Sequence, residues 1–177
     1  MSSAAAPADD ATRSGCPGVA ADAGPLIGLA RIDRLDLLHV LYGTVAIPTS
    51  VLSVLRVSSD RPGARALAGA IEARSLAAGC ENELARLSRV LDAGEASAIL
   101  LAEQVQARFL LIDERLGRQV ARVRGLPVVG VAGVLLAARR TGRLDSVGAV
   151  LRALSQQHYR LSDALVHEIL RLAGELD

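Results

Sequence analysis

The chain has 177 residues, of which 51% are hydrophobic and 2% aromatic, and its formal net charge is +1. A chain of this length can fold as one domain around an aliphatic core, and its near-neutral charge argues against a general polyanion binder. The longest apolar stretch, at 126–138, is shorter than the roughly 20 residues that span a bilayer and contains Gly and Pro, so we expect no membrane span.

The N-terminal residues lack a basic region followed by an apolar one, which is the pattern of a secretory signal. We expect residues 1–17 to form a disordered leader and 18–177 to form a single domain in the cytoplasm. Cys16 and Cys80 have neither the spacing of a disulfide framework nor that of a zinc site.

Short apolar runs alternate with helical patterns through the rest of the chain. Strands are expected at 18–22, 44–48, 108–113 and 126–130, and 75–79 has the composition of a further short strand. Helices are expected at 25–32 with Pro25 in its first position, 34–42, 49–57 with Thr49 as cap, 64–73, 81–91, 92–105, 114–125 and 131–142. Residues 147–177 are expected to form two helices, the second capped by Ser162. The alternation predicts a parallel sheet with helices on both faces.

Three acids fall where the expected sheet has its carboxyl edge. Asp22 and Asp113 end two of the strands, and Glu95 lies at the start of the helix that precedes Asp113. Ligands of open parallel α/β sheets bind outside the carboxyl ends of the strands. Carboxylates gathered there repel one another unless cations lie between them, and Mg²⁺ or Mn²⁺ suits such oxygen ligands. The pattern suits a metal site, for which phosphodiester hydrolysis is the natural reaction.

Each acid also has a purely structural interpretation, and the spacing does not decide between the two. Asp22 is placed to order the turn at Gly24 and Pro25, and Asp113 to cap the helix at 114–125. Glu95 is placed to complete a capping box that begins three residues earlier.

A basic patch lies beside the expected metal site. Eight arginines and two acids fall between 108 and 143, although every one of the 20 basic residues of the chain is Arg. Arg115, Arg118 and Arg122 share one helix face, because they are three and then four residues apart. Such a row fits an RNA backbone, since Arg binds phosphate bidentately; the alternative is a solvated helix face.

The remaining candidates for chemistry form no recognisable site. The three histidines lie in separate expected helices without metal-ligand spacing, as surface or packing residues: His39, His158 and His167. The glycines form neither a G-x-G-x-x-G pattern nor a P-loop, so no dinucleotide or nucleoside triphosphate site is predicted.

Three motifs, "ADAGPLIGLARIDRLDLLHVLYGTVAIPTSVL", "LDAGEASAILLAEQ" and "LLIDERLGRQVARVRGLPVVGVAGVLLAARRTG", occur in this order. With them, residues 18–175 resemble the PIN-domain superfamily, and are most similar to a small prokaryotic branch related to VapC-type toxin ribonucleases. The resemblance implies a Rossmann-like three-layer α/β/α fold, with a mainly parallel sheet of about four to five strands, and RNA cleavage that depends on Mg²⁺ or Mn²⁺. By motif it implies that Asp22, Glu95 and Asp113 are the catalytic, metal-ligating acids.

Around these acids we expect Glu114 to serve as an auxiliary acid and Arg115, Arg118 and Arg122 to contact RNA phosphates. The chain also departs from the family pattern. Ser53 and Val54 stand where a further acid is expected, and Ala23 and Val131 stand where the branch usually has hydroxyl residues. The departures predict weakened metal binding.

We therefore predict a metal-dependent endoribonuclease that cleaves single-stranded RNA, as the toxin component of a toxin–antitoxin pair with a small antitoxin protein as partner. The alternative is a catalytically impaired PIN-like module that binds nucleic acid without turnover. The high apolar content further predicts a homodimer, since large exposed apolar patches mark interfaces.

Overall fold

The structure is a computed structural model that describes residues 17–51 and 71–176. Several of the sequence predictions lie outside these residues: the leader up to residue 16 with Cys16, most of the helix at 49–57 with Ser53 and Val54, and the first part of the helix at 64–73. No helix of the two described ranges has the length and apolar character needed to cross a membrane.

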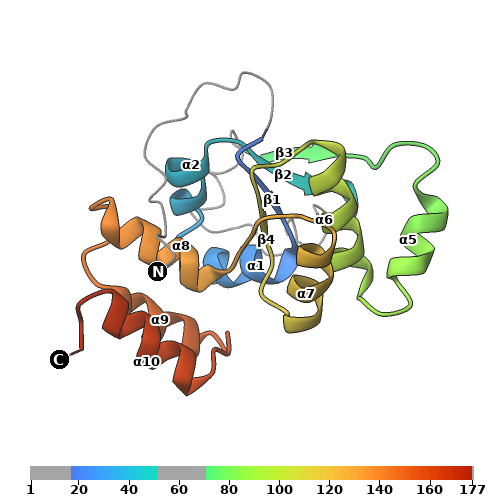
Figure 1. The fold of residues 1–177 in the computed structure, drawn as a ribbon. Helices are drawn as coiled ribbons and strands as arrows, with labels where there is room; N and C mark the ends of the chain where they lie inside the picture. The colour runs from blue at the N-terminus through green and yellow to red at the C-terminus, as the bar shows by residue number, and fades with distance from the viewer. Residues whose placement is uncertain (1–16, 52–70, 177) are drawn as a thin grey trace, which may run out of the picture.

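A five-stranded, all-parallel sheet with the strand order β3-β2-β1-β4-β5 lies at the centre of the protein (Figure 1). The strands are β1 (Val19–Ala21), β2 (Val45–Pro48), β3 (Ile71–Arg74), β4 (Phe109–Leu111) and β5 (Val128–Val129). Val19 pairs with Val45 on one side and with Phe109 on the other, so β1 is the central strand. The predicted parallel sheet of four to five strands is confirmed.

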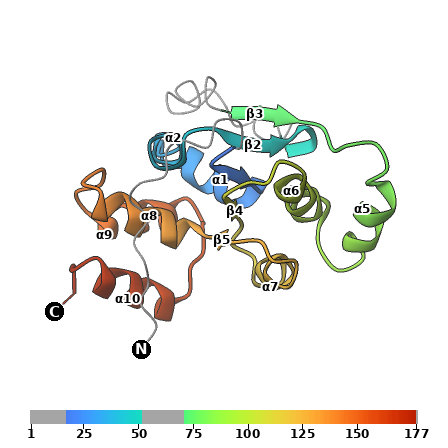
Figure 2. The same cartoon turned by 45° about the horizontal axis from the view of Figure 1, so that its top comes forward.

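Helices cover both faces of this sheet, as Figure 2 shows. The helices that can be given in full within the described residues are α1 (Ala23–Arg31), α2 (Asp36–Tyr42), α5 (Glu81–Leu87), α6 (Ala93–Gln104), α7 (Arg115–Val123), α8 (Val131–Arg140), α9 (Val147–Gln156) and α10 (Asp163–Leu172). Alternate strand residues point to opposite faces. Val19 and Ala21 belong to the apolar core shared with α1, α2, α8 and α9, whereas Ala20 belongs to the core shared with α6 and α7. The three-layer α/β/α fold is therefore confirmed.

Side-chain caps fix where several helices begin. Ser162 caps α10 by accepting from the backbone of Leu165, as predicted. Asp22 caps α1 by accepting from Gly24, so that helix begins at Ala23 and not at Pro25 as predicted. The carboxylate supplies the acceptor that the first turn of a helix lacks.

The predicted helix at 64–73 is wrong at its end. Residues 71–74 form the edge strand β3, whose four residues pair with Val45–Pro48 of β2. The short strand expected at 75–79 is also wrong, since an irregular turn occupies these residues. The helical preference of Ala and Glu is weak compared with the hydrogen bonds that a neighbouring strand offers.

Candidate active site

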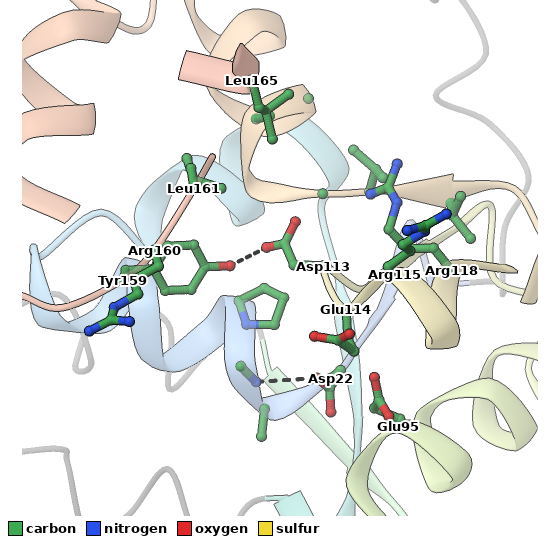
Figure 3. A pocket seen from close by; sticks show the side chains of 18 of the residues that line it. Asp22, Glu95, Asp113, Glu114, Arg115, Arg118, Tyr159, Arg160, Leu161 and Leu165 are labelled. Atoms are coloured by element: carbon green, nitrogen blue, oxygen red, sulfur yellow. Dashed lines mark hydrogen bonds between the residues drawn. The ribbon is translucent and has the colours of Figure 1, made fainter. Parts of the chain in front are cut away.

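A cleft of about 970 Å³ opens at the carboxyl edge of the sheet, and all three predicted acids line it (Figure 3). Asp22 comes from the turn between β1 and α1, Glu95 from the first turn of α6, and Asp113 from the end of β4. Glu114 lines the same cleft. The sequence expectation that these side chains meet at one edge therefore holds.

Asp22 lines the cleft and is buried, with 8% of its surface exposed. Its Oδ2 accepts a hydrogen bond from the backbone N–H of Gly24 at 3.3 Å, and its own backbone N–H donates to the carbonyl of Leu111 at 3.0 Å. Burial raises the pKa of this carboxyl, and the charges of Asp92 and Asp113 raise it further, against the hydrogen bonds from the first turn of α1. The residue is a helix cap and a cleft acid at once.

Glu95 is 4% exposed and completes the predicted capping box. Its backbone N–H donates to Asp92 at 2.8 Å, and its Oε2 accepts from the backbone of Asp92 at 3.2 Å. The other oxygen, Oε1, is buried without a hydrogen-bond partner among the described residues. Burial is the main cause that raises the pKa of Glu95, and the charges of nearby acids, Asp22 among them, raise it further. Such an unpaired buried oxygen is costly unless a ligand satisfies it.

Asp113 does not cap α7, the helix that follows it, so the capping role that the sequence offered for this acid is wrong. Its carboxylate instead accepts from the backbone N–H of Val131, at the start of α8, and from the hydroxyl of Tyr159. Burial raises the pKa of Asp113, while the hydrogen bonds from Tyr159 and Val131 and the charge of Arg118 lower it in part.

Two of the three predicted arginines reach the cleft. Arg115 and Arg118 line it, and Arg118 also donates from Nη1 to the carbonyl of Ile112 at 3.1 Å. Arg122 lies one turn further along α7, is exposed, and does not belong to the described residues that line the cleft. A further arginine that the sequence analysis missed, Arg160, lines the cleft from the segment between α9 and α10.

Sequence reasoning also missed Asp92 and Tyr159 as lining residues. Asp92 had a detectable signal, because the cap of α6 stands three residues before Glu95 at the same edge. Tyr159 had none, since its place depends on how the C-terminal helices pack against α1.

Glycines make the space in which these acids lie. A Cβ atom on Gly117 would lie 2.7 Å from Oε1 of Glu95, and one on Gly130 would lie 2.3 Å from Oδ1 of Asp113. Both distances are shorter than any van der Waals contact. The carboxylates therefore occupy positions that a side chain on either glycine would fill.

The donor chemistry of the cleft fits a hard divalent cation. Carboxylate oxygens are the ligands that Mg²⁺ and Mn²⁺ prefer, and the buried, unpaired Oε1 of Glu95 is an acceptor that a cation would satisfy. Within residues 17–51 and 71–176, however, no group of three or more His, Cys, Asp or Glu side chains is close enough to hold a metal ion together. The acids share a cleft without forming a preassembled cage.

Two of the residues that differ from the expected family pattern begin helices beside the acids. Ala23 is the first residue of α1, beside Asp22, and Val131 is the first residue of α8, with its side chain fully buried. Neither side chain supplies an oxygen to the cleft, so its acids lack the hydroxyl neighbours expected at these positions.

A family model described as a PIN domain matches residues 18–175, a range that includes every lining residue of the cleft. Searches against curated proteins and against solved structures returned no match.

Proposed function

The chain belongs to the PIN-domain family, and on that premise we propose that it is a metal-dependent endoribonuclease that cleaves single-stranded RNA in the acidic cleft. PIN domains are generally nucleases. The observation that carries the proposal is the convergence of Asp22, Glu95 and Asp113 in one cleft beside Arg115 and Arg118.

In this proposal Asp22, Glu95 and Asp113 would hold the cation in the cleft. Mg²⁺ or Mn²⁺ bound there would supply an activated water and would stabilise charge on the leaving oxygen. Arg115 and Arg118 orient the phosphate with their guanidinium forks, which match a phosphodiester in shape and charge. Glu114 is the auxiliary acid.

The assay is cleavage of single-stranded RNA by the purified chain with Mg²⁺ or Mn²⁺, with and without EDTA. We expect cleavage that EDTA stops and that Asp22→Asn abolishes, since a contaminating nuclease would survive that substitution. Cleavage without metal, or equal cleavage by the variant, would contradict the proposal. Single-stranded DNA of the same sequence tests the preference for RNA.

The role as a toxin has its own experiment. We propose that the chain arrests growth when expressed alone and that a small antitoxin protein from an adjacent reading frame relieves the arrest. Expression of the Asp22→Asn variant should leave growth unaffected. If this variant arrests growth at the same protein level, the toxicity does not depend on the acids of the cleft.

A second candidate function is an RNA-binding module without turnover. This second function is favoured by Ala23 and Val131, which supply no oxygen to the cleft. It is also favoured because the described part of the chain holds no group of three acids close enough to bind a metal ion. It predicts RNA binding that weakens steeply with salt, and no cleavage with either cation.

A further inference from the structure

Tyr159 reaches into the cleft from outside the sheet. It lies three residues after the end of α9, and its hydroxyl donates a hydrogen bond to Oδ2 of Asp113, 46 residues earlier in the chain (Figure 3). The C-terminal helices therefore contribute a polar group to an acid that ends β4.

The ring of Tyr159 is held in place by α1. Gly28 faces it so closely that a Cβ atom there would lie 2.5 Å from Cδ2 of the ring. Only a residue without a side chain leaves room for the ring, so its direction toward Asp113 is fixed by packing.

The backbone that carries Tyr159 is held as well. Its N–H donates to the carbonyl of Leu154 at 2.9 Å, which closes the last turn of α9. Arg31, the last residue of α1, donates to the carbonyl of Gln157 at 3.2 Å. Two contacts with α1 and one with α9 thus locate the hydroxyl.

The hydrogen bond restrains the Asp113 carboxylate. The N–H of Val131 lies near both of its oxygens, at 3.1 and 3.3 Å, whereas Tyr159 bonds only to Oδ2. A carboxylate bonded on two sides keeps one orientation, and Oδ1, which accepts only from Val131 among the described residues, still has a lone pair for a cation. Partners that orient ligating groups in this way typically change metal affinity by about 10–100-fold when removed.

We propose that Tyr159 is a positioning residue, whose hydroxyl orients the Asp113 carboxylate for a divalent cation in the cleft. The inference rests on the proposed function, because it assigns the cation to the same acids. It also makes the segment between α9 and α10 a part of the site.

The test is the dissociation constant for Mn²⁺, measured by calorimetry on the full chain. Tyr159→Phe keeps the ring against Gly28 and removes only the hydroxyl, so we expect Mn²⁺ to bind about 10–100-fold more weakly. The matched control is Tyr42→Phe, the same change at the other tyrosine of the chain, whose ring packs edge-on against Phe109 outside the cleft. Its Mn²⁺ affinity should equal that of the wild type.

A second variant covers the case in which Tyr159→Phe does not fold. Gly28→Ala keeps the hydroxyl on Tyr159 but forces the ring that carries it to move, so it should also weaken Mn²⁺ binding. For both variants, RNA cleavage should recover as the Mn²⁺ concentration is raised, because the lost orientation affects cation binding and not the arginines. Because a bound cation also stabilises the fold, thermal unfolding of the metal-free variants is compared with that of the wild type, and unchanged unfolding temperatures separate lost orientation from damage to the fold.

The outcomes separate the two proposals. If the wild type binds Mn²⁺ and both variants bind it equally well or more tightly, Tyr159 does not position Asp113 and the inference fails, while the proposed nuclease stands. If the wild type itself binds no Mn²⁺ at millimolar concentration, the proposed function fails and this inference fails with it.

Discussion

The backbone nitrogen of Val131 lies 3.1 Å from Oδ1 of Asp113 and 3.3 Å from Oδ2, so the acid that ends β4 lies at the N-terminus of the helix that follows β5. A helix N-terminus stabilises negative charge through its free N–H groups and its dipole. The contact counteracts the burial that raises the pKa of Asp113. The same hydrogen bonds fix the position of the Asp113 carboxylate relative to α8.

Gly130 is the position at which this contact can be disturbed. In Gly130→Ala the added methyl group would lie 2.3 Å from Oδ1 of Asp113 and 2.7 Å from Nη1 of Arg118, so both side chains must move. We expect the variant to lose about 1–3 kcal/mol of stability and most of its stabilisation by Mn²⁺. Urea unfolding with and without Mn²⁺ measures both.

The control for that substitution is Gly24→Ala. A Cβ there would lie 3.5 Å from Oδ2 of Asp22, which is an ordinary contact. The stability of this variant should therefore stay within about 0.5 kcal/mol of wild type, and its response to Mn²⁺ should be unchanged. If the two variants show the same stability and the same response to Mn²⁺, the absence of a side chain at Gly130 does not control the position of Asp113.

Asp22→Asn separates the two roles of Asp22. Asparagine is also a good cap for α1, but it carries no charge, so the metal-free variant should be as stable as wild type or more stable. A cation that binds only the folded wild type adds about 2.7 kcal/mol at a hundredfold excess over Kd. Thermal unfolding should show this increment in the wild type and little of it in Asp22→Asn. If the increment persists in the variant, Asp22 is a cap and not a metal ligand.

Glu95 predicts how stability changes with pH. Its pKa is raised in the folded protein, mainly by burial, so its contribution to stability is present below its unfolded pKa of about 4.5 and is lost as pH rises through the folded value. Glu95→Gln keeps the capping box and cannot ionise. The free energy of unfolding of Glu95→Gln minus that of wild type should therefore increase as pH rises above 4.5, and then level off.

Urea unfolding of the metal-free proteins between pH 4 and 8 measures this difference. Glu168→Gln is the control, because Glu168 is an exposed carboxylate whose pKa is lowered by its hydrogen bond with Arg171. Its difference from wild type should be small and of opposite sign. A flat difference for Glu95→Gln would mean that burial does not destabilise its charge.

The arginines of α7 predict how RNA binding depends on salt. Each phosphate contact with a single strand contributes about 0.7 to the slope of log K against log salt. Arg115→Gln and Arg118→Gln should each flatten the slope by about this amount, whereas Arg122→Gln should change it less, because Arg122 lies outside the cleft lining. Fluorescence anisotropy on an inactive Asp22→Asn background measures the slopes. Equal effects at all three positions would indicate binding along the whole helix face and not in the cleft.

The gathering of the acids could be predicted because it follows from the direction of the strands. In a parallel sheet Asp22 and Asp113 must leave the same edge, and Glu95 begins a helix there. Strand β3 could not be predicted, since its residues favour a helix until β2 pairs with them. Tyr159 could not be predicted either, because no local pattern shows that α1 directs its ring toward an acid 46 residues away.

The order of the strands also decides when, during synthesis, the cleft can form. The central strand β1 is made early, but its neighbour β4 lies about ninety residues further along the chain, and the backbone of Asp22 bonds to Leu111 of that strand. Tyr159 emerges later still. At typical rates of about 5–20 residues per second, about 7–27 s separate the synthesis of Asp22 from that of Tyr159. A nascent chain therefore exposes Asp22 without an assembled site, and a chain with the proposed activity cannot use that site until β4 and Tyr159 have been synthesised.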